Sequence, residues 1–175
     1  SLLAGVPLKR LREAFSEHSC VRTVPNAPVL VAEGLTGLSF DDDLTDNQKK
    51  YVEKLFQPIS DVLELPEEQL DPFLALTSSG PAYIALLAEA LGDGAVAAGL
   101  PRQLADYLTP KMIAGSGSLL QQEGIHPAQL KNMVSSPGGT TLAGLRHLEK
   151  SGFRSALIEA VLAASHRSKE LSKAS

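Results

Sequence analysis

The stretch MVSSPGGTTLAGLRHLE, residues 133–149, changes character at its middle. Leu142, Leu145 and Leu148 lie at helical spacing in its second half, which predicts an amphipathic helix. The preceding Ser-Ser-Pro-Gly-Gly-Thr-Thr, residues 135–141, has two adjacent glycines between hydroxyl side chains and no bulky residue. Adjacent glycines permit a tight or left-handed backbone, because no Cβ stands in the way. The segment therefore predicts an open turn that leads directly into a helix.

A helix start of this kind can bind an anion. The amides near Gly139, Thr140 and Thr141 would point out of the helix N-terminus without partners. These amides and the helix dipole favour negative charge, and a carboxylate suits a pocket lined by backbone. A plain loop that ends in a Thr N-cap is the alternative. Four nearby hydroxyls could donate to a carboxylate or a ring nitrogen: Ser135, Ser136, Thr140 and Thr141.

Two further stretches have a related design. TSSGPAYIAL, residues 77–86, runs from small residues through Gly80-Pro81 into a predicted helix. Two such helix starts in one helical domain can face a single pocket, and a plain capped helix is the alternative. VRTVPNAP, residues 21–28, places Pro-Asn at the carboxyl end of a short predicted strand, where open α/β sheets bind ligands. The alternative there is a plain turn.

The hydrophobic pattern divides the chain near residue 66. Before it, predicted strands and helices alternate, which is typical of the end of an α/β domain. We expect helices over 7–18 and 41–59, strands over 20–24, 34–40 and 60–66, and a turn or short helix at 27. From residue 67 every segment is helical, with helices over 81–100, 101–124, 126–134 and 152–171 besides the one already described. The expected fold is mostly α.

Composition excludes several classes of protein. Of the 175 residues, 43% are hydrophobic and 21% charged, and the net charge of −4 offers no basic surface for nucleic acid. We expect no membrane association, because no apolar run approaches the roughly 20 residues that are needed to span a bilayer. We also expect no signal peptide. Cys20 is the single cysteine and the histidines are far apart, so we expect no disulfide, no metal site and a cytoplasmic location. Asp41–Asp43 are interpreted as an exposed helix cap.

Several predicted helices are too apolar for a small bundle with one core. IALLAEAL (84–91) and SALIEAVLAA (155–164) would leave apolar faces in water. Burial between two subunits resolves this, so we expect an obligate homodimer with interlocked helices. A compact monomeric bundle is the alternative.

Taken together, the motifs resemble one known family. VRTVPNAP, SSGPAY, GLPRQLA and HPAQLKNMVSSPGGTTLAGLRHLEKSGFRSALIEAV follow one another as in pyrroline-5-carboxylate reductase, the last enzyme of proline biosynthesis, over essentially the whole chain. The resemblance implies an oxidoreductase with a Rossmann domain that binds NADPH or NADH and a helical domain that interlocks with its twin. Residues 1–66 resemble the C-terminal part of the Rossmann domain, and residues 67–175 the helical dimerisation and substrate-binding domain. Homodimers of this family often assemble further, into decamers.

The resemblance also implies residue roles. The substrate 1-pyrroline-5-carboxylate would receive a hydride at its C=N carbon, with Thr141 as the catalytic residue that approaches the ring nitrogen. Ser78 replaces a Gly of the family pattern, and Val24 replaces a Met. The substrate-binding residues would be Ser136, Gly138, Gly139, Thr140 and Thr141. The cofactor-binding residues would be Val24, Pro25, Asn26, Ser79, Gly80 and Pro81.

The family's Gly-rich turn for the cofactor pyrophosphate does not occur in these 175 residues. We therefore expect this chain, by itself, to be inactive. Two alternatives stay open. One is a related imine or β-hydroxyacid reductase, and the other is a helical dimerisation module without catalysis.

Overall fold

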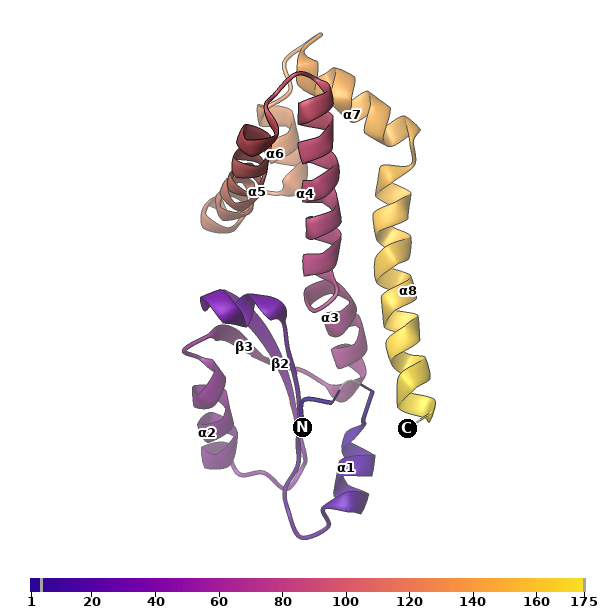
Figure 1. The fold of residues 1–175 in the computed structure, drawn as a ribbon. Helices are drawn as coiled ribbons and strands as arrows, with labels where there is room; N and C mark the ends of the chain where they lie inside the picture. Colours follow the sequence, from indigo (N-terminus) through magenta and orange to yellow (C-terminus); the bar gives the residue numbers. More distant parts are fainter. Residues whose placement is uncertain (4, 175) are drawn as a thin grey trace. The chain divides into compact units, whose positions relative to one another are not determined.

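The computed structural model describes residues 1–3 and 5–174, without the side chains of residues 122, 123 and 174. The chain forms two compact units. The first comprises Ser1–Pro81 with Ile158–Ser175, and the second comprises Ala82–Leu157. Helices dominate both (Figure 1), so the expectation of a mostly α fold is confirmed.

A small sheet organises the first unit. Strands β1 (Val21–Pro25), β2 (Gly34–Phe40) and β3 (Ser60–Glu64) lie in the order β1-β2-β3. β1 pairs antiparallel with β2, and β2 pairs parallel with β3. The parallel pair is connected through α2 (Asp46–Phe56), as a parallel connection requires. The short helix η1 (Ala27–Val31) links β1 to β2, and α1 (Leu8–Ala14) precedes the sheet.

Helix α3 (Leu70–Thr77) packs closely on β2, after the short helix η2 (Glu67–Gln69). A Cβ at Gly37 of β2 would lie 2.9 Å from the Phe73 ring and 3.0 Å from Leu70, so only glycine permits this approach. Leu38 and Leu70 have no exposed surface. The contact of α3 with β2 therefore supplies much of the core of this unit.

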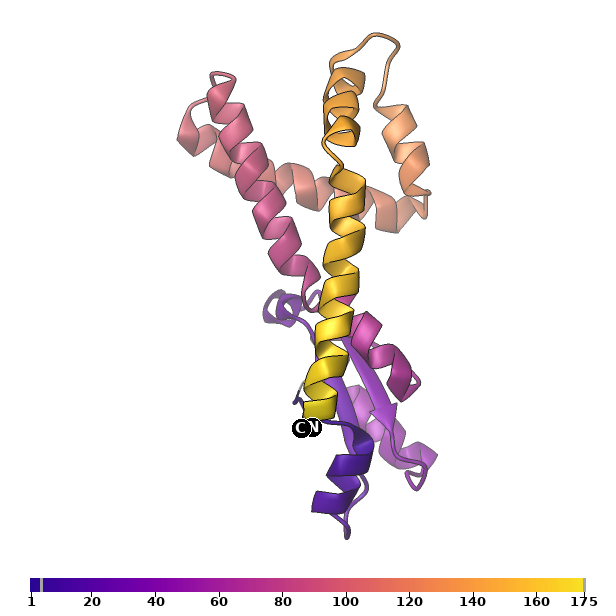
Figure 2. The same ribbon diagram turned by 90° about the vertical axis from the view of Figure 1, so that its right-hand side faces the viewer.

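The last turns of α8 belong to the same unit. Gly5 lies against Leu171, because a Cβ added to Gly5 would be 3.0 Å from the Leu171 Cβ. The two chain ends accordingly lie near one another in both views (Figures 1 and 2). Residues more than 160 positions apart in the sequence thus lie in one compact unit.

The second unit consists of helices and the turns between them. It contains most of α4 (Gly80–Ala97), all of α5 (Arg102–Glu123), α6 (Pro127–Met133) and α7 (Thr140–Lys150), and the start of α8 (Phe153–Ala174). Glycines with positive φ follow three of these helices, at Gly99, Gly124 and Gly152. The left-handed backbone ends a helix without the steric cost that a Cβ would add. The predicted helices are therefore confirmed, with boundaries that differ by a few residues.

The interpretation of Asp41–Asp43 as an exposed helix cap is wrong. Helix α2 begins at Asp46, where Thr45 and Gln48 form a reciprocal capping box. Asp41 is buried, with 5% of its surface exposed, and its carboxylate lies 3.1 Å from Arg12 Nε. The Asp41 carboxylate therefore forms an ion pair that connects α1 to the end of β2.

The expectation that no stretch reaches the length of a membrane span needs correction. Within the described residues, Glu67–Ala97 has the length and apolar composition of a helix that could cross a bilayer. Its charged residues are too widely spaced to interrupt the apolar run. The run is broken at Ser78 and Ser79, however, where α3 ends and α4 begins. Large apolar side chains are exposed along it and along α8, among them Leu76, Leu86, Ile158 and Leu162.

Candidate functional site

The turn before α7 has the backbone that its glycines permit. Gly138 has φ +68°, in the left-handed region, and Gly139 is the N-cap residue with extended backbone. The Gly139 amide donates a 3.0 Å hydrogen bond to the carbonyl of Ser136, which closes the turn. No side chain caps the helix, so the alternative of a Thr N-cap is not observed. The turn is built from backbone alone.

Three amides at this helix start have no acceptor within the described chain. Ala143 is the first residue of α7 whose amide has a backbone acceptor, the Gly139 carbonyl at 3.3 Å. The amides of Thr140, Thr141 and Leu142 therefore point out of the helix end. The sequence-based expectation also counted the Gly139 amide among the free ones, which is wrong, because Ser136 occupies it. Thr141 is half-buried, and neither threonine hydroxyl bonds to another described protein group.

Gly139 is required by the space around it. A Cβ at this residue would overlap the Ser136 Oγ and would lie 3.1 Å from the Ser136 carbonyl oxygen. A larger residue would have to displace the Ser136 hydroxyl and would press on the Ser136 carbonyl. Three amides, two hydroxyls and a closed glycine turn together can hold a small anion such as a carboxylate.

The turn at the carboxyl end of β1 lies beside the end of α3. The Asn26 Nδ2 donates to the Thr77 carbonyl at 3.1 Å, and the Ser78 Oγ donates to the Pro25 carbonyl at 3.2 Å. These bonds join Pro25 and Asn26 to the end of α3, directly before Ser79–Pro81, so the two expected cofactor-side segments meet at Thr77 and Ser78. Sequence reasoning had marked Ser78 only as a departure from the family pattern and had missed its contact.

The two groups of expected site residues belong to different units. The cofactor-side residues lie in the unit that contains Ser1–Pro81, and residues 136–141 lie in the unit Ala82–Leu157. Each group is compact and is described here by itself.

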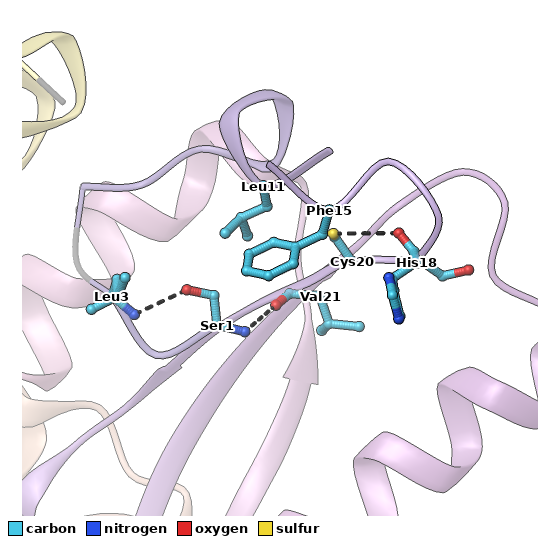
Figure 3. A pocket seen from close by; sticks show the side chains of 8 residues that line it. Ser1, Leu3, Leu11, Phe15, His18, Cys20 and Val21 are labelled. Carbon is cyan, nitrogen blue, oxygen red and sulfur yellow. Dashed lines mark hydrogen bonds between the residues drawn. The ribbon is translucent and has the colours of Figure 1, made fainter. Parts of the chain in front are cut away.

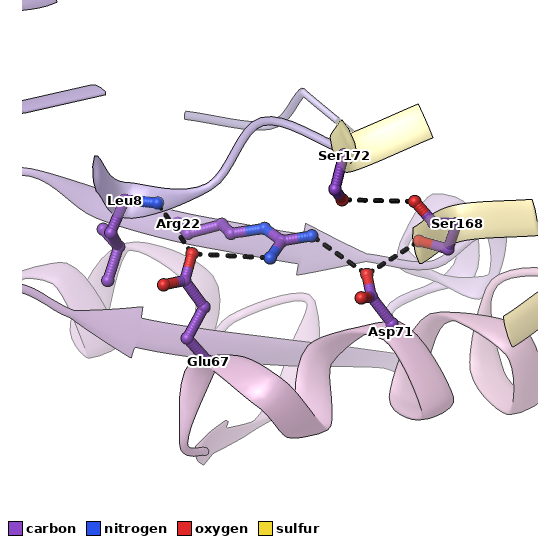
Figure 4. Close-up of polar contacts among 6 residues, drawn as sticks. All are labelled: Leu8, Arg22, Glu67, Asp71, Ser168 and Ser172. Atoms are coloured by element: carbon purple, nitrogen blue, oxygen red, sulfur yellow. Dashed lines mark hydrogen bonds and ion pairs between the residues drawn. The ribbon is translucent and has the colours of Figure 1, made fainter. Parts of the chain in front are cut away.

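A buried polar network lies next to the cofactor-side residues along β1 (Figure 4). The Arg22 Nη2 lies 3.2 Å from Asp71 Oδ1, and its Nη1 lies 3.5 Å from Glu67 Oε1. Glu67 Oε1 also accepts the Leu8 amide at 2.6 Å, and the Ser168 Oγ donates to Asp71 Oδ1 at 2.8 Å. Arg22 Nε is buried without a partner among the described residues. Sequence reasoning missed this network, since only a lone arginine within a strand signals it.

A hollow beside the first residues contains none of the expected site residues (Figure 3). Its lining is mainly apolar, and Figure 3 marks three hydrogen bonds there, one of them from the Leu3 amide to the Ser1 Oγ at 3.3 Å. The Ser1 amino group donates to the Val21 carbonyl at 2.6 Å, and the Cys20 thiol donates to the His18 carbonyl at 3.6 Å. Within the described residues, no three His, Cys, Asp or Glu side chains are arranged to hold a metal ion.

The resolved pKa shifts lie outside the expected site. At the turn between α7 and α8, Arg154 Nη2 lies 2.6 Å from Glu149 Oε1, and the hydrogen bond from Arg154 lowers the pKa of Glu149. Both side chains are exposed, so the pair fixes the local turn and contributes little to stability.

Known proteins share both the sequence and the fold. The family model for pyrroline-5-carboxylate reductase dimerisation matches residues 67–171. The chain is 45% identical to the pyrroline-5-carboxylate reductase of Synechocystis sp. over 99% of its own length and 65% of the relative's. It is 43% identical to that of Pisum sativum, over 98% of its own length and 63% of the relative's. The chain thus spans slightly less than two thirds of these relatives.

A solved structure agrees closely. The pyrroline carboxylate reductase of Plasmodium falciparum, determined with NADP bound, superposes with a TM-score of 0.93 at 35% identity. That match covers 98% of this chain and 70% of the other. The chain belongs to the pyrroline-5-carboxylate reductase family.

Proposed function

We propose that the protein reduces 1-pyrroline-5-carboxylate to L-proline with NADPH or NADH as the reductant, the last step of proline biosynthesis. The start of α7 carries the proposal. Three amides there have no acceptor among the described residues, and a Cβ at Gly139 would press on Ser136. A substrate that combines one carboxylate with a flat ring suits a shallow site of this kind, because nothing bulky keeps the ring away.

The carboxylate of the substrate would bind at the helix end. The amides of Thr140, Thr141 and Leu142 donate toward it, and the helix dipole adds a favourable field. Ser136 and Gly138 shape the turn, and Gly139 keeps the approach open. The Gly139 amide takes no part, because it already bonds to Ser136.

Thr141 would act at the ring nitrogen. Its side chain is half-buried and makes no hydrogen bond to another described group, so its hydroxyl is available. The protonated imine carries its own proton, and the Thr141 oxygen accepts a hydrogen bond from that N–H. The C=N carbon gains a hydride and the nitrogen keeps its proton, which yields the secondary amine of proline. Orientation and charge complementarity supply most of the catalysis.

The nicotinamide would bind beside the β1 turn. The bound cofactor supplies the hydride, and NADP in the Plasmodium relative supports this cofactor class. The residues that fit are Val24, Pro25, Asn26, Ser79, Gly80 and Pro81. Their fit is supported by open space over Gly80, where a Cβ would meet no atom within 4 Å. Since the 175 residues contain no Gly-x-Gly-x-x-Gly turn for the pyrophosphate, we expect no turnover from residues 1–175 alone.

The proposed assembly is a homodimer formed through interlocked helices, with decamers built from dimers. The match of the dimerisation family to residues 67–171 supports this, as does the exposed apolar surface of α4 and α8. The same match supports a domain boundary at residues 66 and 67. A partner subunit would cover the apolar run Glu67–Ala97, so we propose a cytoplasmic protein that binds neither membranes nor nucleic acid.

A comparison of two imines tests the proposal. The gene product, purified as expressed, should have a kcat/KM for 1-pyrroline-5-carboxylate at least about 100-fold above that for 1-pyrroline, since the carboxylate is missing from the latter. Equal values would contradict the carboxylate site. Greater activity toward another imine or a β-hydroxyacid would assign the chain to a related reductase, and no activity toward any of them would favour a dimerisation module.

A further inference from the structure

The turn that follows β1 and the end of α3 hold each other by reciprocal hydrogen bonds. The side chain of Asn26 reaches the Thr77 carbonyl at 3.1 Å, and the side chain of Ser78 reaches the Pro25 carbonyl at 3.2 Å. One donor thus comes from each segment, and each acceptor is backbone of the other segment. We call these two bonds the clamp. Because two parallel contacts join the same pair of segments, neither can slide past the other without loss of a bond.

Both polar atoms of the Asn26 side-chain amide form hydrogen bonds in this arrangement. Its Oδ1 accepts the Leu35 amide at 2.8 Å, while its Nδ2 bonds to Thr77. The residue is only 8% exposed. One side chain therefore connects the end of β1, the start of β2 and the end of α3. A buried amide with this set of partners acts through the segments it holds.

Ser78 lies where α3 stops. The amides of Ser78 and Ser79 both donate to the Leu74 carbonyl, at 2.9 and 3.1 Å, so the helix ends on a shared acceptor. The Ser78 hydroxyl points away from the helix and donates a hydrogen bond to the Pro25 carbonyl. The reductase pattern has a glycine here, which has no hydroxyl to donate. The second bond of the clamp is thus a property of this chain's own residue.

The segment that the clamp holds leads directly to the start of α4. Gly80 and Pro81 follow Ser78 within three positions, in the same compact unit as Pro25 and Asn26. A Cβ added to Gly80 would meet no described atom within 4 Å, so the space beside this residue is open. A small displacement of the end of α3 would therefore change the distance between this helix start and the β1 turn.

We propose that Asn26 and Ser78 are positioning residues for the reduced dinucleotide. The clamp sets the width of the space between the Pro25 turn and Gly80, and the nicotinamide ring binds in that space. The inference rests on the proposed function for the identity of the ring. Asn26 would position the ring indirectly, through the segments that it holds. Ser78 would do so through a hydroxyl that the glycine of the family pattern does not have.

Direct titration of NADPH tests the clamp without turnover. In the gene product as expressed, Ser78→Ala should raise the Kd and the KM for NADPH by about fivefold, as for one lost hydrogen bond, with the KM for the imine changed less than about twofold. Ser78→Thr keeps the hydroxyl and should restore the wild-type Kd. Ser172→Ala is the matched control, because it removes a half-buried hydroxyl that donates to the Ser168 carbonyl at 3.1 Å, away from the β1 turn.

Asn26→Asp provides a second variant. It keeps the acceptor for the Leu35 amide but replaces the donor to Thr77 with a carboxylate oxygen, so the NADPH affinity should fall further than in Ser78→Ala. An unchanged Kd in Ser78→Ala, or equal losses for NADPH and the imine, would overturn the clamp. NADPH binding that weakens as expected in a protein that reduces no imine would leave the clamp standing and overturn the proposed function alone.

Discussion

The hydroxyl of Ser168 donates a 2.8 Å hydrogen bond to Asp71, although 97 positions separate the two residues. The same Asp71 oxygen lies 3.2 Å from the guanidinium of Arg22 on β1 (Figure 4). One buried carboxylate oxygen therefore connects the end of α8, the start of α3 and the first strand. This connection explains why the last turns of α8 belong to the unit that contains the sheet.

Loss of the Asp71 carboxylate should strongly destabilise the protein. Asp71→Ala leaves Arg22, whose side chain is 3% exposed, with only the 3.5 Å contact to Glu67. A buried charge that loses its main partner costs about 3–5 kcal/mol of unfolding free energy. Guanidinium denaturation measures this. Glu149→Gln removes an exposed pair with Arg154 and serves as the control, with a midpoint close to that of the wild type. Equal midpoints for the two variants would show that the buried network adds no stability.

Gly139→Val should abolish activity while the protein remains folded and dimeric. The branched side chain would collide with Ser136 and crowd the place where we propose that the carboxylate binds. Steady-state kinetics and light scattering are the measurements. Gly144→Ala in the same helix is the control, because a Cβ there meets nothing within 4 Å and alanine favours the helix. Full activity in Gly139→Val would mean that the substrate binds elsewhere.

Thr141→Ala should weaken transition-state binding through the loss of the bond to the ring nitrogen. We expect a loss of kcat/KM that corresponds to about 1–3 kcal/mol of transition-state stabilisation. Thr141→Ser should retain most of the activity. The Kd for NADPH should stay the same, because the proposed contact of Thr141 is with the imine. A loss in Thr141→Ser as large as that in Thr141→Ala would remove the hydroxyl from the mechanism.

The wild-type protein should be at least a dimer at micromolar concentration. Size-exclusion chromatography with light scattering measures this, and a monomer mass would contradict the proposal. A charge on the apolar face of α8 should weaken the association. Leu162 is 56% exposed in the single chain, and Leu162→Glu would place a carboxylate where a partner is expected. Lys173→Glu, also exposed but near the helix end, should leave the mass unchanged.

Local patterns in the sequence predicted the elements well. Apolar spacing placed the helices, and the structure shows that Gly99, Gly124 and Gly152, all with positive φ, follow the ends of three of them. The glycine turn before α7 was predicted for the same reason, since a positive φ at Gly138 needs no knowledge of distant residues. These features depend on residues within a few positions of one another.

Contacts across the chain could not be predicted in this way. The Asp41 carboxylate was interpreted from its place before a helix, but it is buried and forms an ion pair with Arg12 of α1, whose side chain is half exposed. The clamp of Asn26 and Ser78 and the network around Asp71 join residues about 50 or more positions apart. Nothing in the local sequence indicates which polar groups meet once the helices pack on the sheet.

The central claim is that the protein converts pyrroline-5-carboxylate to proline, and the most direct test is the stoichiometry of that conversion. The gene product, purified as expressed, is mixed with NADPH and 1-pyrroline-5-carboxylate, and proline is quantified against the NADPH that is oxidised. We predict equal amounts of proline formed and NADPH oxidised, and no oxidation without the imine. No formation of proline with either NADPH or NADH, from a folded and oligomeric gene product that includes a pyrophosphate-binding turn, would contradict the account.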